Sequence, residues 1–328
     1  MTVKGPDIQE IHALRERLTQ ATLETPVLRC AAIEGVLGGD TRVHAKLEFL
    51  QRTGTFKARG ALATLQGLSA AQKAAGVTAV SAGNHAIATA YAARTVGTTA
   101  KVVMIGSANP LRIARCRAYG AEVILVDDVH EAFEVAESIQ REEGRYFVHP
   151  FEGPSIALGT GTVGLEICEQ VPDFDALIVP IGGGGLIAGI ANAVKQLRPD
   201  SEIIGVEPEG ADSMSRSREA GEVRSIDKVN TIADSLGAPF AMPYSFALTE
   251  EHVDRLVTVD DEALRRTMGF LFRTMKLAVE PACVASTAAL LGPLRKDLLG
   301  KRVVIVMCGS NIDWDTFERQ AIFDDDIA

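Results

Sequence analysis

The sequence is poor in cysteine, and its cysteines are not spaced to act together. There are five among 328 residues, an odd number, and none forms a C-x-x-C pair. This excludes the usual zinc-binding and dithiol redox motifs and favours a reducing environment. The first ten residues, MTVKGPDIQE, also lack the apolar core of a secretory signal peptide. We therefore expect a cytoplasmic protein.

The chain also lacks an excess of basic residues and an uninterrupted apolar span. Lysine and arginine number 33 against 43 aspartate and glutamate, a net charge of −10. Because this average charge repels nucleic-acid phosphates and anionic lipids, neither a nucleic acid nor a membrane is an expected partner. The long uncharged run at residues 176–194 contains Pro180 and five glycines. It is predicted to form a buried strand, a loop and a helix rather than a membrane-spanning helix.

What the sequence does contain is an alternation of short β-branched runs with helix-type segments. Runs such as KVVMIG, EVILVD, DALIVPIG and KRVVIVMCG are separated by segments of helical period. Continuous apolar strands suit a sheet covered on both faces, and the alternation indicates parallel strands joined by crossover helices. The predicted class is α/β. At roughly 150 residues per domain we expect two domains: a small inserted α/β domain at residues 69–154, and a large domain at residues 1–68 and 155–328.

Open α/β sheets bind ligands beyond the carboxyl ends of their strands, so the loops there are the candidates for a functional site. One of them consists of Gly182, Gly183, Gly184, Gly185 and Leu186. Glycines let several backbone N–H groups approach one anion, and a helix N-terminus favours negative charge. The loop is therefore predicted to bind a phosphate, although its spacing matches neither a P-loop nor a dinucleotide-binding motif. The alternative is a flexible loop without a ligand.

A second loop contains a lysine at the start of a predicted helix. In TGTFKARG, residues 53–60, Lys57 follows the predicted strand VHAKLEFL and lies near Arg59. Partial burial beside a cation would lower the pKa of the lysine amine and make it nucleophilic. The alternative is an ordinary solvated lysine.

A third loop, SAGNHA, joins another strand to a helix. Its hydroxyl, amide and helix-start N–H groups suit a carboxylate. The alternative is simple N-capping by Ser81 or Asn84. His85 is not expected to bind a metal, because no second histidine or carboxylate lies at ligand spacing.

Together these motifs resemble those of the pyridoxal phosphate enzymes of the serine/threonine dehydratase and serine racemase family, whose fold includes tryptophan synthase β. TGTFKARGA resembles the family's Schiff-base lysine segment, SAGNHA its substrate-carboxylate loop and GGGGLIAG its phosphate-binding loop. MCGSNID resembles the segment that reaches the cofactor ring nitrogen, and the resemblance extends over about residues 24–315. It implies two open, twisted, mostly parallel sheets flanked by helices (fold type II), with pyridoxal 5′-phosphate where the two domains meet.

The resemblance implies a role for each matching residue. Lys57 would hold the cofactor as a Schiff base and then act as general base at the substrate Cα. Phe56 would pack near the cofactor ring, and Asn84 would hydrogen bond its phenolic oxygen. The other cofactor contacts implied are Gly182, Gly183, Gly184, Gly185 and Leu186 at the phosphate, with Glu280 and Cys308 at the ring. The implied substrate-carboxylate residues are Ser81, Ala82, Gly83, Asn84 and His85.

The expected reaction depends on Cys308 and Ala82. A thiol is a weak hydrogen-bond donor, so a ring that it partners is a weaker carbanion sink, which favours prompt loss of a β-hydroxyl group. Without the resemblance, Cys308 would be a small buried hydrophobic residue. Serine racemases carry serine where this chain has Ala82, and alanine has no proton to give to the opposite face of Cα. We therefore expect a dehydratase that converts an L-β-hydroxy amino acid of the threonine or serine type into a 2-oxo acid and ammonia.

Departures from the family pattern keep the substrate and the metal open. Residues 159–162 read G-T-G-T rather than G-Q-G-T, and I-A replaces Q-G after the asparagine loop. A larger substrate such as phenylserine or 3-hydroxyaspartate is therefore an alternative. The cation site of some members would fall on Glu207, Ala211 and Ser213. Because a serine there replaces a charged ligand, the expected grip on magnesium or calcium is weakened; metal binding stays open, and no metal ligand is predicted.

Other functions compete with the dehydratase. On the same fold they are an amino-acid racemase and a β-replacement enzyme of the cysteine synthase type, although T-F-K-A-R-G resembles dehydratases more than synthases. A protein that binds a nucleotide or cofactor without catalysis would explain the glycine loop but would not need Lys57. The expected partner is a small amino-acid substrate. The family often forms dimers, and the resemblance leaves a homodimer open.

Overall fold

The computed structural model describes residues 3–323, which form two separate β-sheets. The larger sheet has six strands in the order β1-β2-β10-β7-β8-β9, and every neighbouring pair is parallel except β1 with β2. Its strands are β1 (Val27–Arg29), β2 (Arg42–Leu47), β7 (Ala176–Pro180), β8 (Glu202–Pro208), β9 (Arg255–Val259) and β10 (Arg302–Met307).

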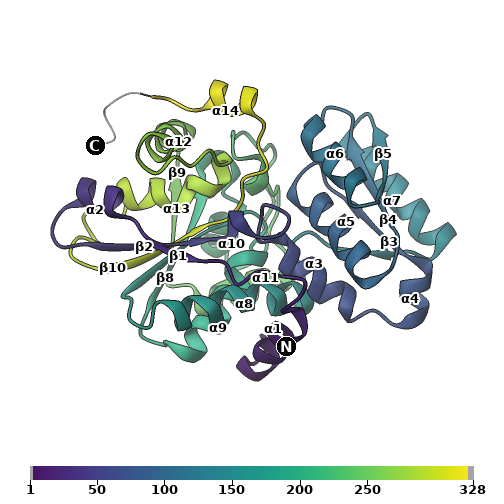
Figure 1. The fold of residues 1–328 in the computed structure, drawn as a ribbon, viewed down its shortest axis with the longest axis horizontal. Helices are drawn as coiled ribbons and strands as arrows, with labels where there is room; N and C mark the ends of the chain where they lie inside the picture. The colour runs from purple at the N-terminus through teal and green to yellow at the C-terminus, as the bar shows by residue number, and fades with distance from the viewer. Residues whose placement is uncertain (1–2, 324–328) are drawn as a thin grey trace.

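The smaller sheet has four strands in the order β5-β4-β3-β6, all parallel. Its strands are β3 (Val77–Val80), β4 (Ala100–Ile105), β5 (Glu122–Val126) and β6 (Tyr146–Phe147). The helices that connect them are α5 (Asn84–Val96), α6 (Pro110–Ala118) and α7 (Val129–Glu143), with α4 (Ala70–Ala75) before β3. This part of the chain lies beside the larger sheet in Figure 1.

Helices cover both faces of the larger sheet (Figure 1). α8 and α9 pack against each other and against α1, while α13 packs on β7 and β10 and against α12. α3 contacts both α5 and α8 and so connects the two sheets. These helices are α1 (Ile8–Leu18), α2 (Ala31–Leu37), α3 (Lys57–Gln66), α8 (Pro154–Gln170), α9 (Gly185–Leu197), α10 (Ser213–Ala220), α11 (Pro243–His252), α12 (Asp261–Met275), α13 (Pro281–Leu291) and α14 (Trp314–Gln320). Short 3-10 turns are η1 (Glu48–Leu50), η2 (Glu209–Ala211) and η3 (Asp234–Leu236).

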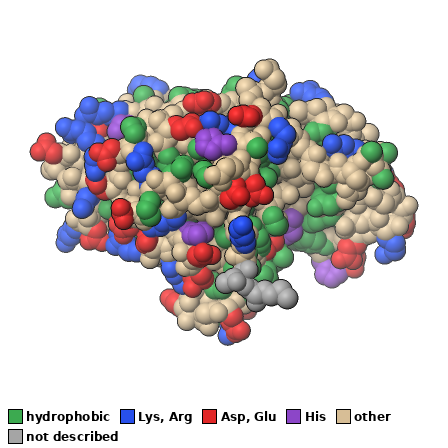
Figure 2. Space-filling model, turned by 90° about the horizontal axis from the view of Figure 1, so that it is seen from below, with side chains coloured by type: hydrophobic (Ala, Val, Ile, Leu, Met, Phe, Trp, Pro, Cys, Tyr) green, Lys and Arg blue, Asp and Glu red, His purple; other side chains and the backbone are tan. Residues whose placement is uncertain are grey.

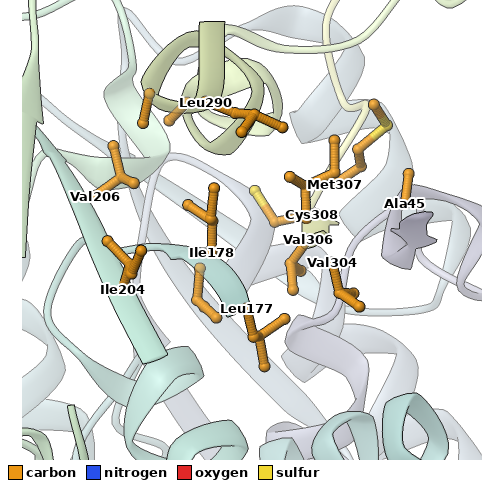
Figure 3. Close-up of a cluster of buried hydrophobic side chains, with 14 of the residues drawn as sticks. Ala45, Leu177, Ile178, Ile204, Val206, Leu290, Val304, Val306, Met307 and Cys308 are labelled. Atoms are coloured by element: carbon orange, nitrogen blue, oxygen red, sulfur yellow. The ribbon is translucent and has the colours of Figure 1, made fainter. Parts of the chain in front are cut away.

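The central strands of the larger sheet are apolar on both faces because helices cover both. Figure 3 shows Ile178 of β7, Ile204 of β8 and Val304 of β10 within one cluster, with Leu290 of α13 above them. Burial of such side chains supplies the main favourable free energy of folding. Cys308 directly follows β10 and belongs to the same cluster, so this apolar core extends to the carboxyl end of the strand.

A buried group of charged side chains anchors α3. The Arg59 guanidinium donates to Glu48 at 2.8 Å and to Glu166 at 2.6 Å, and the Lys46 ammonium donates to Glu166 at 2.6 Å. All four side chains are at most 2% exposed. Buried charges are tolerated when they are paired and hydrogen bonded. The network ties α3 to η1, β2 and α8, although the sequence analysis did not foresee it.

The predicted fold class is confirmed: the chain is α/β, with two mostly parallel open sheets flanked by helices. The run at 176–194 forms β7, a loop and most of α9, as predicted. The domain division at 69–154 stays a prediction; all four strands of the smaller sheet lie within it. Among the described residues, no helix is long and apolar enough to span a membrane. Figure 2 shows acidic and basic side chains interspersed over one face of the molecule.

Candidate active site

The predicted loops meet between the larger and the smaller sheet. Lys57 begins α3 after β2, Asn84 begins α5 after β3, and Gly185 begins α9 after β7. With Cys308 at the end of β10, these residues line one small cavity. Because parallel strands end at the same edge of a sheet, loops far apart in sequence converge here.

Lys57 lines this cavity, and its amine has a lowered pKa. Its Nζ donates to the Pro150 carbonyl at 2.6 Å and lies 5.2 Å from the centre of the Phe56 ring. Burial lowers the pKa of Lys57 to about 8, against an ordinary value of 10.5. The neighbouring Phe56 N–H donates to the Cys308 carbonyl at 3.2 Å, which fixes the lysine segment to the end of β10. The alternative of a solvated surface lysine is therefore wrong.

Three consecutive positions of the glycine loop, Gly183, Gly184 and Gly185, have no room for a larger residue. Gly184 has a φ of +90°, in the left-handed region. A Cβ on Gly183 would lie 2.3 Å from the Phe151 ring, and one on Gly185 would lie 2.3 Å from the Phe151 carbonyl oxygen. Because the first amides of an α-helix have no partner within the helix, the start of α9 is a ready anion site.

Asn84 and Glu280 form a buried polar pair at one wall. The Asn84 amide donates to Glu280 Oε1 at 2.7 Å and to Ser235 Oγ at 3.1 Å, and its carbonyl accepts from Asn311 at 2.6 Å. Glu280 is 1% exposed, and burial raises its pKa to about 7. Its Oε2 accepts no hydrogen bond from the described residues; Arg112 lies 3.7 Å away. A buried acceptor without a donor is suited to a ligand.

Cys308 is a neutral thiol at this wall. It is 2% exposed, and a hydrogen bond with Cys283 together with burial raises its pKa well above the ordinary value. A group beside it therefore meets a weak, uncharged donor rather than a carboxylate.

The SAGNHA loop leads into α5 without the side-chain N-cap that was the alternative to a carboxylate site. The N-cap residue of α5 is Gly83 and no side chain caps the helix, so the N-capping alternative for Ser81 and Asn84 is wrong. The Ser81 hydroxyl instead accepts from the Gly83 N–H at 3.1 Å and shapes the turn. His85 Nε2 lies 2.8 Å from the Val148 carbonyl, and burial lowers its pKa to about 3. His85 is therefore a neutral ring packed beneath the loop.

A larger cavity of about 440 Å³ opens outward from Lys57. It shares Lys57 and Asn84 with the small cavity, and we call the part formed by these residues and the SAGNHA loop its inner end. The rest of its lining includes Val129, Phe133, Phe147, His149, Phe151, Phe240 and Met242. Four of these rings form a series, with centre-to-centre distances of 6.3 Å (Phe147 to His149), 4.8 Å (His149 to Phe151) and 6.2 Å (Phe151 to Phe240). Burial lowers the pKa of His149 to about 4, so the series is uncharged at neutral pH.

Sequence reasoning missed this aromatic wall. The signal was present in RYFVHPFE, where Phe147, His149 and Phe151 alternate. Alternate residues of an extended segment point to the same side. It also missed Arg112, whose guanidinium donates to Asp234 at 2.5 Å and to the Asn311 carbonyl at 3.0 Å. That pair joins α6 to η3 across the cavity.

Comparison with known proteins places the chain in a family. A model described as "Pyridoxal-phosphate dependent enzyme" matches residues 18–309. The chain belongs to this family. Phenylserine dehydratase from Ralstonia pickettii is 53% identical over 318 residues, 97% of each chain, and L-threonine ammonia-lyase from Thermotoga maritima is 37% identical over 95% of this chain and 77% of its own. The structure of maize serine racemase superposes with a TM-score of 0.91 at 34% identity, covering 96% of this chain and 97% of that one.

The predicted family, its dehydratase type and its cofactor, pyridoxal 5′-phosphate, are thus confirmed. The residues present fit the cofactor. Lys57 offers an amine of lowered pKa, the loop around Gly183 offers space that a side chain would fill, and Glu280 offers a buried acceptor without a donor. The individual roles of these residues, like the homodimer and the cytoplasmic location, stay predictions.

The residues of the cation site have other partners in this structure. Glu207 accepts from the Met214 N–H and from the Ser215 N–H, both at 2.8 Å, and so caps α10. The Ser213 hydroxyl donates to the Ala238 carbonyl at 3.2 Å. Across residues 3–323, no group of three or more His, Cys, Asp or Glu side chains is placed to hold a metal ion.

Proposed function

We propose that this enzyme dehydrates L-β-hydroxy amino acids that carry an aromatic ring on Cβ, of the phenylserine type. The products would be a 3-aryl-2-oxo acid and ammonia. The sequence analysis gave this substrate only as an alternative to threonine or serine. The relatives of this chain include both phenylserine dehydratase and L-threonine ammonia-lyase, and its sequence identity to the former is higher.

The observation that carries the proposal is that the larger cavity, of about 440 Å³, has a polar part and an apolar part. Its inner end presents Lys57, Asn84 and Arg112, and the remainder is lined mainly by aromatic and aliphatic side chains. A substrate with a polar amino-acid end and an apolar ring matches both parts. A methyl group or a hydrogen on Cβ would leave most of the apolar lining in contact with water, so it would gain little from burial.

An acidic side chain on Cβ fits less well. The cationic side chain of Arg112 that lines the cavity is already paired with Asp234. A carboxylate in the cavity, as in 3-hydroxyaspartate, would compete with Asp234 for Arg112 and would otherwise meet neutral rings. Burial of an unpaired charge is strongly unfavourable. We therefore place 3-hydroxyaspartate below phenylserine.

In the proposed reaction Lys57 removes the Cα proton. A pKa of about 8 places this amine close to neutrality, where a general base is most effective. When bound, pyridoxal phosphate supplies an electron sink for the negative charge at Cα. The glycine loop would hold the phosphate of the cofactor, Cys308 would partner its ring as a neutral thiol, and Asn84 would hydrogen bond it. The SAGNHA backbone amides hold the substrate carboxylate.

The experiment is a substrate panel with the holoenzyme. L-threo-phenylserine, L-threonine, L-serine and L-threo-3-hydroxyaspartate are compared by kcat/KM, with 2-oxo acid, ammonia and enantiomer measured for each. We expect phenylserine to have the highest kcat/KM and the release of 2-oxo acid and ammonia to be equal. A kcat/KM for threonine or serine equal to or above that for phenylserine would overturn the proposal.

A further inference from the structure

Three large apolar side chains that line the larger cavity are partly exposed to solvent. Phe133 is 45% exposed, Val129 57% and Phe240 39%, and all three line the same cavity. Single exposed apolar residues are normal on a protein surface, but several gathered at one cavity indicate a binding surface.

The position of Phe133 is not explained by packing of its own helix. Ala132, Ala136 and Ile139 bury one face of α7 against the smaller sheet. Val129 and Phe133 are four residues apart, so they lie one above the other along the edge of that buried face. That face lines the cavity rather than the core.

Phe240 approaches the cavity from the part of the chain that holds the glycine loop. Its ring lies 6.2 Å from that of Phe151. Phe151 in turn lies against Gly183, where any Cβ would overlap its ring. The cavity thus has one aromatic boundary connected to the phosphate loop and another, on α7, carried by the smaller sheet.

We propose that Phe133 is a specificity-determining residue, and that the substrate ring binds between Phe133 and Phe240. This inference rests on the proposed function. Lys57 and the SAGNHA loop hold Cα at the inner end, so the substituent on Cβ extends toward the aromatic outer end. A phenyl group contacts Phe133 there, with the edge-to-face or offset geometry that aromatic pairs favour. The methyl group of threonine is shorter than a phenyl ring, and in this proposal it does not contact Phe133.

The test compares Phe133→Ala and Phe133→Leu with the wild-type holoenzyme on phenylserine and on threonine. We expect Phe133→Ala to lower kcat/KM for phenylserine about 10- to 100-fold, with a smaller loss for Phe133→Leu, as for removal of a group in an apolar specificity pocket. Threonine turnover should stay within about threefold, because its methyl group makes no contact with Phe133. The ratio of the two substrates is therefore the decisive quantity.

A binding measurement supports the kinetic one. L-phenylalanine lacks the β-hydroxyl group, so it serves as an unreactive probe of ring binding. Its inhibition constant against phenylserine should rise in Phe133→Ala by about the same factor as kcat/KM falls, while that of L-alanine should not change. A matched control is Leu125→Ala on β5, since Leu125 is 46% exposed but does not line the cavity. This control should leave both substrates and both inhibitors unaffected.

The outcomes separate this inference from the function on which it rests. If the wild-type enzyme does not prefer phenylserine, the proposed function fails. If the wild-type enzyme prefers phenylserine but Phe133→Ala changes both substrates equally, or neither, Phe133 does not determine specificity. Thermal unfolding of each variant distinguishes an equal loss on both substrates from a folding defect.

Discussion

The two ends of the active-site cavity differ in which elements build them and in how their side chains are held. At the inner end, Lys57 and Asn84 begin helices that follow strands, and Cys308 of the adjoining small cavity directly follows β10. Lys57 and Cys308 have shifted pKa values, and the Asn84 side chain forms several hydrogen bonds. At the outer end, Phe133 and Phe240 come from a helix and a loop, are partly exposed and form no hydrogen bonds through their rings.

This difference suggests how one fold serves many substrates. The inner end depends on the convergence of parallel strands, which the whole architecture fixes. The outer end depends on side chains that project from peripheral elements, which can change without disturbing the sheets. We therefore expect substitutions at the inner end to affect all substrates alike, and substitutions at the outer end to change the ratio between substrates.

Lys57→Ala is the strongest test of the inner end. Removal of the proposed general base should lower turnover of every β-hydroxy amino acid by about 10²- to 10⁴-fold. Measurement of 2-oxo acid from phenylserine and from threonine checks whether both fall together. Because the Lys57 ammonium donates only to the Pro150 carbonyl among the described residues, the fold should persist in circular dichroism. A variant that kept full turnover would contradict the catalytic assignment.

Arg59→Ala tests whether the inner end depends on the buried charges beneath α3. The substitution leaves Glu48 and Glu166 without their guanidinium partner in a dry environment. Removal of one member of a buried ion pair costs about 3–5 kcal/mol of the free energy of unfolding, which urea unfolding measures. The matched control is Arg29→Ala, whose guanidinium is 56% exposed where it pairs with Glu34 and should therefore contribute much less. Equal effects of the two substitutions would show that the network does not anchor α3.

Prediction from the sequence followed the same division between the two ends. The α/β class and the three loops could be predicted because each depends on a short local pattern, such as VVIVM for a strand or GGGG for an anion loop. The gathering of Phe133, Phe151 and Phe240 around one cavity could not be predicted, because these residues lie on three segments that only the fold brings together. Phe133, Phe151 and Phe240 carry no shared motif and no fixed spacing.

The buried polar contacts were also beyond local prediction. Arg59 and Glu166 are 107 residues apart, and Asn84 and Glu280 are 196 apart. A charged residue in a sequence is usually assigned to the surface, so pairing in the interior becomes visible only in three dimensions. The capping interpretation of SAGNHA failed for a different reason: the Ser81 hydroxyl is engaged by a nearer donor within its own turn.

Ala82→Ser examines whether chemistry at the inner end can change without a change in substrate. Ala82 belongs to the SAGNHA loop, which lines the inner end of the larger cavity. In the proposed function a hydroxyl group at this position lies near the substrate Cα. A serine can deliver a proton, and we expect racemisation relative to elimination to rise about 10-fold or more. Chiral chromatography of the remaining substrate gives the ratio, and Ala82→Val controls for side-chain size. An unchanged ratio would remove Ala82 as the reason for preferring elimination.

The smallest expected effect concerns the pH dependence of cofactor capture. Only the neutral amine of Lys57 attacks the aldehyde of pyridoxal phosphate, and burial lowers its pKa to about 8. In the apoenzyme the rate of covalent capture should therefore rise about tenfold per pH unit below pH 8 and level off above it. Free lysine side chains, with a pKa of about 10.4, should continue to gain rate up to pH 10. Stopped-flow absorbance of the apoenzyme and of Nα-acetyl-lysine measures both profiles. If the two coincided, the inner end would not differ from solvent at Lys57, and the contrast with the outer end would lose its electrostatic basis.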